Sequence, residues 1–542
     1  MQADSFDYVI VGAGAAGCIL ANRLVEDGRY TVCLLEAGPR DRNLYLHIPG
    51  GFIKAVSNPK YTWQFKTEPG EGTAGRRINT LQGRTLGGST ALNGLNYNRG
   101  QPADFDGWAQ RGNPGWGYDD LLPYFKRSER RIGPADTGLR GTKGLLPITD
   151  CDWRHPLCDA FINAAVETGI PYNPDYNGAS QRGVNYYQRW IHKGWRYSTA
   201  KAFLRPVMNR QTLDVRVNAR AASILFDGKR AIGVRYVQER GGLQSEVRAR
   251  REVILCAGAA NSPRLLHISG VGPSDLVKRI GATVVHDLPG VGENLRDHYL
   301  VRSVSRIKGT TTVNDMVEGY HLVPQIARWL LGKPSILAIS PSVVGAFVNS
   351  RDPAAEPDLQ YVFTPGSYKE SVSGKLDSFP GATLGFYPMR PESIGHIRAR
   401  SIDPFEDPEI QPNYLQDPMD RRATIDGVRL TRRLFNAGPL RKYCVGEVTP
   451  GEALTSDDEL LDFARQKGNT AYHLMGTCRM GPRDRQDSVV DPELKVIGLE
   501  ALRVVDASIM PTMPSANTGA AVFAIAEKAV DMILGRAAPA LV

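Results

Sequence analysis

The chain has 542 residues, a formal net charge of +9, 42% hydrophobic residues and 23% charged residues. This length predicts two closely built domains, and the composition is that of a folded globular protein rather than of a disordered one. Lysine and arginine are scattered, and no basic block interleaved with aromatic residues indicates a nucleic-acid partner. Seven cysteines without CxxC spacing argue against a zinc site and a disulfide framework, so we expect no metal.

The sequence enters a predicted strand almost at once, without the charged and apolar regions of a secretory signal. No uninterrupted apolar run approaches the ~18 residues that a membrane-spanning helix needs. We therefore expect a cytoplasmic protein, with peripheral contact at the inner face of the membrane as the alternative.

A dinucleotide-binding pattern opens the chain. Residues 6–11 form a short apolar run, followed by a GxGxxG turn, a helical pattern and a second apolar run that ends at Glu36. A carboxylate at that position accepts hydrogen bonds from ribose hydroxyls and repels a 2′-phosphate, which argues against NADP and leaves NAD or FAD. The turn glycines, which let a pyrophosphate approach the backbone and the helix N-terminus, are Gly12, Gly14 and Gly17.

Small and polar residues gather in further segments along the chain. Residues 83–93 pack glycines and hydroxyls into a loop where backbone amides approach a flat or anionic ligand. Residues 252–258 are predicted to form a buried strand that ends in glycine, and residues 289–298 form another polar loop. Near the C-terminus, residues 502–506 are predicted to form a strand that ends in an acid.

The middle of the chain has a different pattern. Residues 359–363 and 382–387 predict half-buried antiparallel strands. Residues 323–331 form an apolar, somewhat amphipathic segment, for which we expect a helix that faces the core. A lid or a surface that touches a membrane is the alternative for this segment.

Residues 471–480 and 515–518 contain an imidazole, His473, and an amide, Asn517, just ahead of a long apolar helix. A proton acceptor and a neutral hydrogen-bond donor are the groups needed to take a proton from an alcohol. Histidine suits the first role because its unperturbed pKa lies near neutrality. Taken alone, His473 is more simply explained as a structural histidine, and we expect structural roles for His267 and His298.

Two of these segments, residues 83–93 and 258–272, resemble the signature sequences of the glucose–methanol–choline (GMC) family of FAD-dependent oxidoreductases. The dinucleotide fingerprint, the loop at 294–298 and the segments 473–481 and 505–508 follow in the family's order. The resemblance covers essentially the whole chain and is closest to the bacterial choline- and alcohol-dehydrogenase branch.

The resemblance implies an α/β protein of two domains: a Rossmann-like FAD-binding domain, and an interleaved substrate-binding domain on an antiparallel sheet flanked by helices. The implied FAD-binding domain comprises residues 1–150, 205–300 and 470–542. The implied substrate-binding domain comprises residues 151–204 and 301–469.

The resemblance also assigns roles to single residues. His473 matches the family's active-site histidine, which makes it the predicted base. Asn517 matches the second active-site position, where an amide cannot accept a proton but can donate a hydrogen bond to the developing alkoxide. Some family members attach FAD covalently through a histidine where this chain has Leu92, so we predict non-covalent FAD. The implied FAD contacts are Gly12, Gly14, Gly17, Glu36, Arg84, Gly88, Asn93, Ala221, Asp506, Ala507 and Thr518.

The substrate pocket is the least specified part of the sequence. The predicted substrate residues are Tyr472, which precedes His473, with Phe363 and Tyr97, and further aromatic candidates are Phe347 and Tyr387. For each of these except Tyr472, core packing is the simpler explanation. The predicted reaction is oxidation of a primary or secondary alcohol to an aldehyde or ketone, with oxygen or a quinone-like carrier as electron acceptor. A non-redox lyase or a light-driven decarboxylase on the same flavin scaffold is the alternative. The oligomeric state is not predicted.

Overall fold

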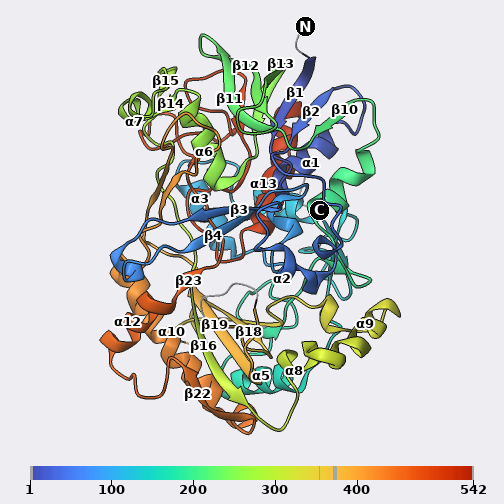
Figure 1. Ribbon diagram of the computed structural model, residues 1–542, viewed down its shortest axis with the longest axis vertical. Coiled ribbons are helices and arrows are strands. Elements are labelled where there is room, and N and C mark those ends of the chain that lie inside the picture. The colour runs from blue at the N-terminus through green and yellow to red at the C-terminus, as the bar shows by residue number, and fades with distance from the viewer. Residues whose placement is uncertain (1–3, 353, 370–374, 540–542) are drawn as a thin grey trace.

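Two seven-stranded sheets organise the chain in a computed structural model that describes residues 4–352, 354–369 and 375–539. Figure 1 shows one sheet in the upper half of the molecule, beside helices α1 and α13, and the other sheet in the lower half. The fold is therefore mixed α/β, as predicted.

The first sheet has a parallel centre. The central strand β1 (Asp4–Val11) lies between β2 (Val32–Leu35) and β13 (Gln244–Leu255), with β10 (Leu213–Arg216) beyond β2. Strand β24 (Leu502–Val504) also pairs with β13 in parallel. The rest of β13 pairs with a hairpin of β11 (Arg220–Asp227) and β12 (Arg230–Val237).

The carboxyl ends of four parallel strands lie at one level. Val11 is in register with Leu35 and with Leu255, and Leu255 is in register with Val504. In open parallel sheets, ligands bind outside this edge. The dinucleotide turn, Glu36, helix α6 (Gly258–Ile268) and Asp506 all follow directly from it.

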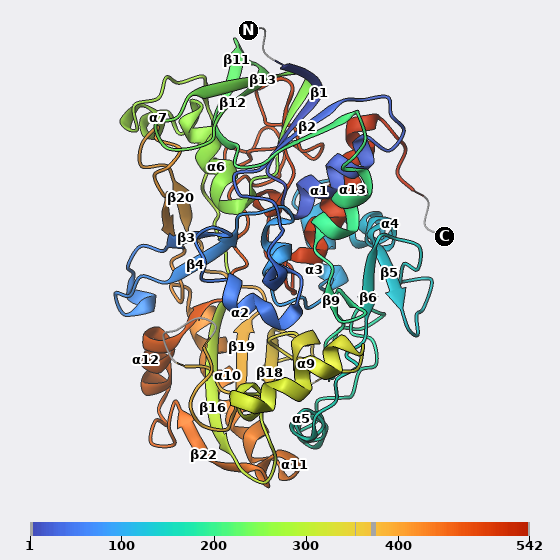
Figure 2. The ribbon, with the colours of Figure 1, turned by 45° about the vertical axis from the view of Figure 1, so that its right-hand side comes forward.

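Helix α1 (Ala15–Leu24) follows the turn, and the C-terminal helix α13 (Gly519–Leu534) packs beside it. Both views place the two helices side by side (Figures 1 and 2). Arg23 of α1 and Glu527 of α13 form an ion pair with 2.9 Å between Nη2 and Oε1. The glutamate side chain is fully buried, so this pair fixes the two helices against each other inside the core.

The second sheet is antiparallel, and helices α5 (Pro156–Glu167) and α10 (Pro418–Asn436) pack against it. In spatial order its strands are β22 (Cys444–Thr449), β16 (Tyr299–Ile307), β19 (Gly381–Pro388), β18 (Leu359–Thr364), β17 (Val344–Val348) and β7 (Gly183–Tyr186). A seventh strand, β23 (Asn469–Thr470), pairs with the start of β16.

The prediction of antiparallel strands over 359–363 and 382–387 is confirmed, but the prediction that they are half-buried is wrong. Every residue of β19 is buried, and so is every residue of β18 except Val362. Helices cover one face of this sheet, and on the other face Gln360 reaches Asn517 just ahead of α13. The second sheet therefore has no solvent face over these strands.

The strands of the first sheet come from residues 4–35, 213–255 and 502–504, and those of the second from 183–186 and 299–470. The chain thus passes between the sheets several times, and the domain boundaries given above stay a prediction. The remaining helices and strands are α2 (Phe52–Ala55), β3 (Thr62–Lys66), β4 (Asn79–Gly83), α3 (Pro102–Gln110), α4 (Tyr118–Ser128), β5 (Glu129–Ile132), β6 (Leu146–Thr149), β8 (Ile191–His192), β9 (Trp195–Arg196), β14 (Val271–Gly272), α7 (Ser274–Arg279), β15 (His286–Asp287), α8 (Val313–Val317), α9 (Leu322–Leu330), β20 (His396–Arg398), β21 (Glu409–Gln411), α11 (Gly438–Arg441) and α12 (Asp457–Lys467).

Helix α9 corrects the expectation for residues 323–331. The segment is helical, but none of its residues is buried, so it does not face the core. Figure 1 shows α9 at the right-hand edge of the lower half. The Trp329 indole donates to the Gly194 carbonyl (2.9 Å) and holds one side of the helix to the body. Within the described ranges, no helix combines the length and hydropathy that crossing a membrane requires.

Candidate active site

The turn after β1 has the geometry that a pyrophosphate-binding turn needs. Gly12 has φ +104°, and a Cβ there would lie 2.4 Å from the Cys256 carbonyl oxygen. A Cβ on Gly17 would lie 1.9 Å from the Gly12 oxygen, so glycine is required at both positions. Gly14 begins α1 without a side-chain cap, and the first turn carries no acid. The first amides of α1 are therefore available to an anionic group.

The second glycine-rich loop folds directly onto this turn. The Gly87 N–H donates to the Ala13 carbonyl (2.8 Å). Gly88 has φ +52°, and a Cβ there would lie 2.7 Å from the Gly14 Cα. Two backbone segments that are 74 positions apart in the chain thus form one cradle of glycines. A larger residue at Gly12, Gly17 or Gly88 would collide with neighbouring backbone and open this cradle.

Glu36 lies at the end of β2, buried beside the turn. Its two carboxylate oxygens accept hydrogen bonds from the Ala13 N–H (3.0 Å) and the Gly38 N–H (2.8 Å). Burial raises the pKa of this carboxyl to about 7, and the two amide donors oppose that rise. A carboxylate held this way retains lone pairs for further donors such as ribose hydroxyls.

Other predicted cofactor residues surround the same edge. One carboxylate oxygen of Asp506 accepts two hydrogen bonds from the start of α6, from the Gly258 N–H (2.9 Å) and the Ser262 hydroxyl (2.6 Å). It therefore joins β24 to α6. Arg84 stacks over Trp63 at 5.2 Å from the ring centroid. Ala221 lies in β11, Ala507 follows Asp506, Asn93 ends the second loop, and Thr518 begins α13 without a side-chain cap.

His473 and Asn517 come together from separate segments. Asn517 Nδ2 lies 3.2 Å from His473 Nε2, and both residues are only partly buried. Tyr472, directly before the histidine, has φ +65°, a left-handed conformation that turns the chain sharply. The His473 N–H donates to Asp297 Oδ1 at 2.7 Å. The turn at Tyr472 and the hydrogen bond to Asp297 thereby fix the backbone of His473.

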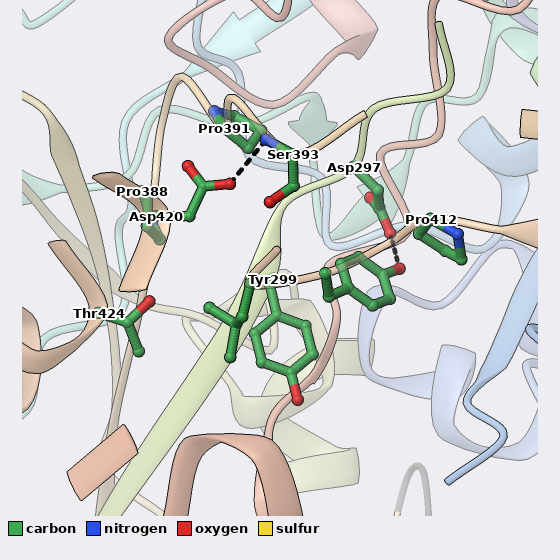
Figure 3. A pocket seen from close by; sticks show the side chains of 10 residues that line it. Asp297, Tyr299, Pro388, Pro391, Ser393, Pro412, Asp420 and Thr424 are labelled. Carbon is green, nitrogen blue, oxygen red and sulfur yellow. Dashed lines mark hydrogen bonds between the residues drawn. The ribbon is translucent and has the colours of Figure 1, made fainter. Parts of the chain in front are cut away.

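Asp297, the buried acceptor of the His473 N–H, also binds two hydroxyl groups. Its other oxygen accepts from the Tyr414 phenol at 2.5 Å and from the Thr470 hydroxyl. Figure 3 shows the Asp297 carboxylate with a dashed line to a hydroxyl group beside Pro412. Burial raises the pKa of Asp297 to about 6, against the effect of these donors. The residue before it, Arg296, also aligns the two loops, because Arg296 and Met475 exchange both backbone hydrogen bonds (3.1 and 3.0 Å).

The tautomer of His473 follows from a hydrogen-bond chain that begins at a carbonyl. His298 Nε2 lies 2.8 Å from the Met389 carbonyl oxygen, which can only accept, so this nitrogen carries a proton. Burial lowers the pKa of His298 to about 4, which leaves its Nδ1 as an acceptor at neutral pH. His473 Nδ1, 2.8 Å away, must then donate, and its lone pair lies on Nε2.

A second chain reaches the same conclusion from the other side. The Tyr187 hydroxyl donates to the Tyr361 carbonyl (2.9 Å), so its oxygen accepts from Gln360 Nε2 (2.8 Å). The same Gln360 nitrogen donates to Asn517 Oδ1 (3.1 Å). The Asn517 NH₂ group therefore points toward His473 Nε2, and a donor faces a lone pair across the space between them.

The pKa of His473 is held well below its usual value, first by burial and then by the neighbouring His298. The imidazole is therefore neutral at pH 7 and has a lone pair available. A neutral base beside a neutral amide donor can take a proton from a hydroxyl group and stabilise the oxygen that remains.

The structure separates the three predicted substrate residues. Tyr472 adjoins His473, whereas Phe363 stacks on Phe161 of α5 with 4.6 Å between ring centroids. Phe363 thus lies on the face of β18 opposite to Gln360, because side chains alternate along a strand. The Tyr97 hydroxyl accepts from Arg99 Nε (3.3 Å), a group ion-paired with the buried Glu129. Phe363 and Tyr97 are therefore core residues.

Sequence reasoning missed His298 and Gln360 as neighbours of the catalytic pair. His298 was assigned a structural role, and its contact with His473 arises only where two loops meet. A signal for Gln360 was present, since it is a polar residue inside an apolar strand. The structural role expected for His267 agrees with its hydrogen bond to the Val291 carbonyl (3.0 Å).

All seven cysteines are free, and all except the partly buried Cys444 are buried. In the part of the chain that the structure describes, no group of three or more His, Cys, Asp or Glu residues is placed to hold a metal ion.

Comparisons with known proteins show which family the chain resembles. Family models described as GMC oxidoreductase match residues 6–300 and residues 391–526. The chain is 39% identical to "Alcohol dehydrogenase [acceptor]" of Pseudomonas putida, over 98% of this chain and 96% of that protein. It is 38% identical to "Oxygen-dependent choline dehydrogenase" of Photobacterium profundum, over 98% and 93%.

Comparison with solved structures gives matches over nearly the whole chain. Pyridoxine 4-oxidase from Mesorbium loti superposes with a TM-score of 0.88 at 31% identity, over 99% of this chain and 100% of that one. Formate oxidase superposes with a TM-score of 0.90 at 26% identity, over 99% of each chain. The fold and the site together thus define the class of protein: a two-domain flavoenzyme with a histidine–amide pair.

The chain belongs to the GMC oxidoreductase family. Its cofactor is FAD, for which the glycine cradle, the uncapped start of α1 and the buried Glu36 provide a fitting site. Leu92 packs into a small apolar cluster with Leu46 and Tyr61, and its side chain has no atom that could bond to a flavin. The cofactor is therefore held non-covalently.

Proposed function

We propose that this protein oxidises a primary or secondary alcohol to the aldehyde or ketone. His473 takes the hydroxyl proton at Nε2, and Asn517 donates from Nδ2 to the alcohol oxygen. The observation that carries the proposal is the 3.2 Å approach of these two atoms, with a lone pair on one and N–H on the other. The names of the relatives, an alcohol dehydrogenase and a choline dehydrogenase, support the substrate class.

Bound FAD supplies the acceptor for the hydride that leaves the alcohol carbon. The chain's own residues prepare that transfer: the base removes the proton, and the amide stabilises the oxygen while negative charge develops on it. The uncapped N-terminus of α13 directly follows Asn517 and adds a positive dipole end at this place. The residues proposed to hold FAD are Gly12, Gly14, Gly17, Glu36, Arg84, Gly88, Asn93, Ala221, Asp506, Ala507 and Thr518.

The test is anaerobic mixing of the FAD-loaded protein with a panel of aliphatic, aromatic and polyol alcohols. We expect at least one class to bleach the flavin absorbance while the matching carbonyl compound forms. Product formation without bleaching, or only under blue light, would instead support the lyase or decarboxylase alternative. One relative is named as oxygen-dependent and the other only with an unspecified acceptor, so reoxidation by oxygen and by a quinone is then compared on the reduced protein.

We also propose that α9 contacts an anionic membrane surface. Its outward side carries Val323, Ile326, Leu330 and Leu331 at helical spacing, and the first and third of these side chains are 63% and 71% exposed. The charged residues in 322–333, Arg328 and Lys333, are both basic. An amphipathic helix with exposed apolar residues and basic charges binds the headgroup region of anionic bilayers.

Replacing Leu330 by glutamate should weaken this contact, because it places a negative charge within the apolar side of α9. We expect the unchanged protein to co-sediment with vesicles that contain phosphatidylglycerol, and the bound fraction of the variant to fall several-fold. The matched control is Leu243→Glu, at a leucine 94% exposed in the turn between β12 and β13. Equal sedimentation of both variants and the unchanged protein would contradict the proposal.

A further inference from the structure

Tyr387 faces the catalytic pair from the second sheet. It lies in β19 directly opposite Gln360 of β18, and cross-strand partners project from the same face. Gln360 uses that face to bind Asn517. The neighbouring residues Tyr361 and Phe386 pair with each other and project from the other face, toward the helices. Register alone therefore places the Tyr387 side chain on the side of the sheet that carries the active site.

The Tyr387 ring is fixed by the two histidines of the site. It stacks on His298 with ring centroids 4.5 Å apart and an angle of 25° between the planes. It meets His473 edge-on, at 5.9 Å and 73°. The side chain is 2% exposed, so the ring has one position and its hydroxyl points in one direction.

The hydroxyl of Tyr387 is buried, and among the described residues it makes no hydrogen bond of good geometry, although the Asn517 amide lies near it. The nearby polar groups of this face are already used: the Tyr187 hydroxyl donates to a carbonyl, and the Gln360 NH₂ donates to Tyr187 and Asn517. A buried hydroxyl left unpaired destabilises a fold, and such groups in native proteins call for an explanation. A ligand oxygen would provide the missing partner.

We propose that the Tyr387 hydroxyl donates a hydrogen bond to the oxygen of the bound alcohol, as a second donor beside Asn517. This inference rests on the proposed function. The alcohol oxygen then gives its proton to His473 and is held by two neutral donors while negative charge develops on it. Burial raises the pKa of Tyr387 well above its usual value, so the phenol keeps its proton and acts as a donor.

Tyr387→Phe tests the proposal because it removes only the hydroxyl. We expect kcat/KM for flavin reduction to fall about 10- to 100-fold, with unchanged flavin content. The melting temperature should stay equal or rise, since an unpaired buried polar group is lost. The matched control is Tyr186→Phe, whose hydroxyl donates to Asp159 Oδ1 (2.8 Å) of α5 on the helix side of the sheet. That variant should lose melting temperature and keep kcat/KM.

A wild-type rate in Tyr387→Phe would overturn the inference, while alcohol-dependent bleaching by the unchanged protein would leave the proposed function standing. Failure of the proposed function shows differently, as no bleaching by the unchanged protein with any alcohol. The double variant Tyr387→Phe/Asn517→Ala separates direct contact from positioning. Losses that multiply support two donors on one oxygen. A double variant no slower than Asn517→Ala alone would overturn direct contact and leave Tyr387 as a positioning residue for the amide.

Discussion

Replacing His473 by alanine is expected to slow flavin reduction by an alcohol about 10²- to 10⁴-fold, the usual contribution of a general base. Asn517 cannot take over the proton because it is an amide, and the lone pair of His298 lies on Nδ1, directed at the position of the His473 ring rather than at the Asn517 amide. Stopped-flow absorbance under anaerobic conditions measures the rate. His396→Ala is the matched control, because that imidazole pairs with Glu409 (2.8 Å) away from the site. Bleaching of His473→Ala at the wild-type rate would refute the assigned base.

The same base predicts the pH dependence of the unchanged protein. Because burial and His298 hold the pKa of His473 well below its usual value, the imidazole is unprotonated, and therefore active, throughout the neutral range. The rate of flavin reduction should be constant at neutral and higher pH, and should fall as pH is lowered through the depressed pKa. A rate that instead rises as pH is lowered would contradict this assignment.

Replacing Asn517 by alanine is expected to slow flavin reduction about 10²- to 10³-fold, the loss typical for one preorganised donor to an oxyanion. Asn517→Asp should be similarly slow at neutral pH, since a carboxylate cannot donate and repels the developing charge. It should also raise the pKa of His473, so the acid limb of its pH profile should move to higher pH.

Two observations separate a role in catalysis from a role in folding for Asn517. The melting temperature and flavin content of Asn517→Ala should stay near those of the unchanged protein. Asn436→Ala is a matched control, because that amide donates to the Arg432 carbonyl (3.0 Å) on the exposed end of α10. An Asn517→Ala variant that keeps the full rate would show that the amide does not act on the substrate oxygen.

The cofactor half of the site could be predicted from sequence because its signal is local. Gly12, Gly14, Gly17 and Glu36 fall within one strand–turn–helix–strand unit, in which steric constraints specify glycine and the end of β2 specifies the position of the acid. The antiparallel character of the second sheet was also visible in the alternation of residues 359–363. The interleaved order of the segments came from the family resemblance and not from any local pattern.

The substrate half could not be predicted in the same way, for two physical reasons. Strands β18 and β19 are buried on both faces, so periodicity does not reveal that Phe363 faces the helices while Gln360 and Tyr387 face the active site. The partnership of His298 with His473 depends on contact between loops 175 positions apart. The prediction that α9 faces the core was wrong because its apolar side points outward. An apolar stripe in the sequence does not indicate whether protein or another surface covers it.

Both hydrogen-bond chains that place the proton of the base end on main-chain carbonyls, those of Met389 and Tyr361. No side-chain replacement can remove a carbonyl, so the location of the proton depends first on strand geometry. Changes in the residues that meet the rest of the alcohol can therefore alter which substrate is accepted without moving the proton. Proton placement and substrate choice are thus separately adjustable, which would allow one scaffold to be adapted to many alcohols.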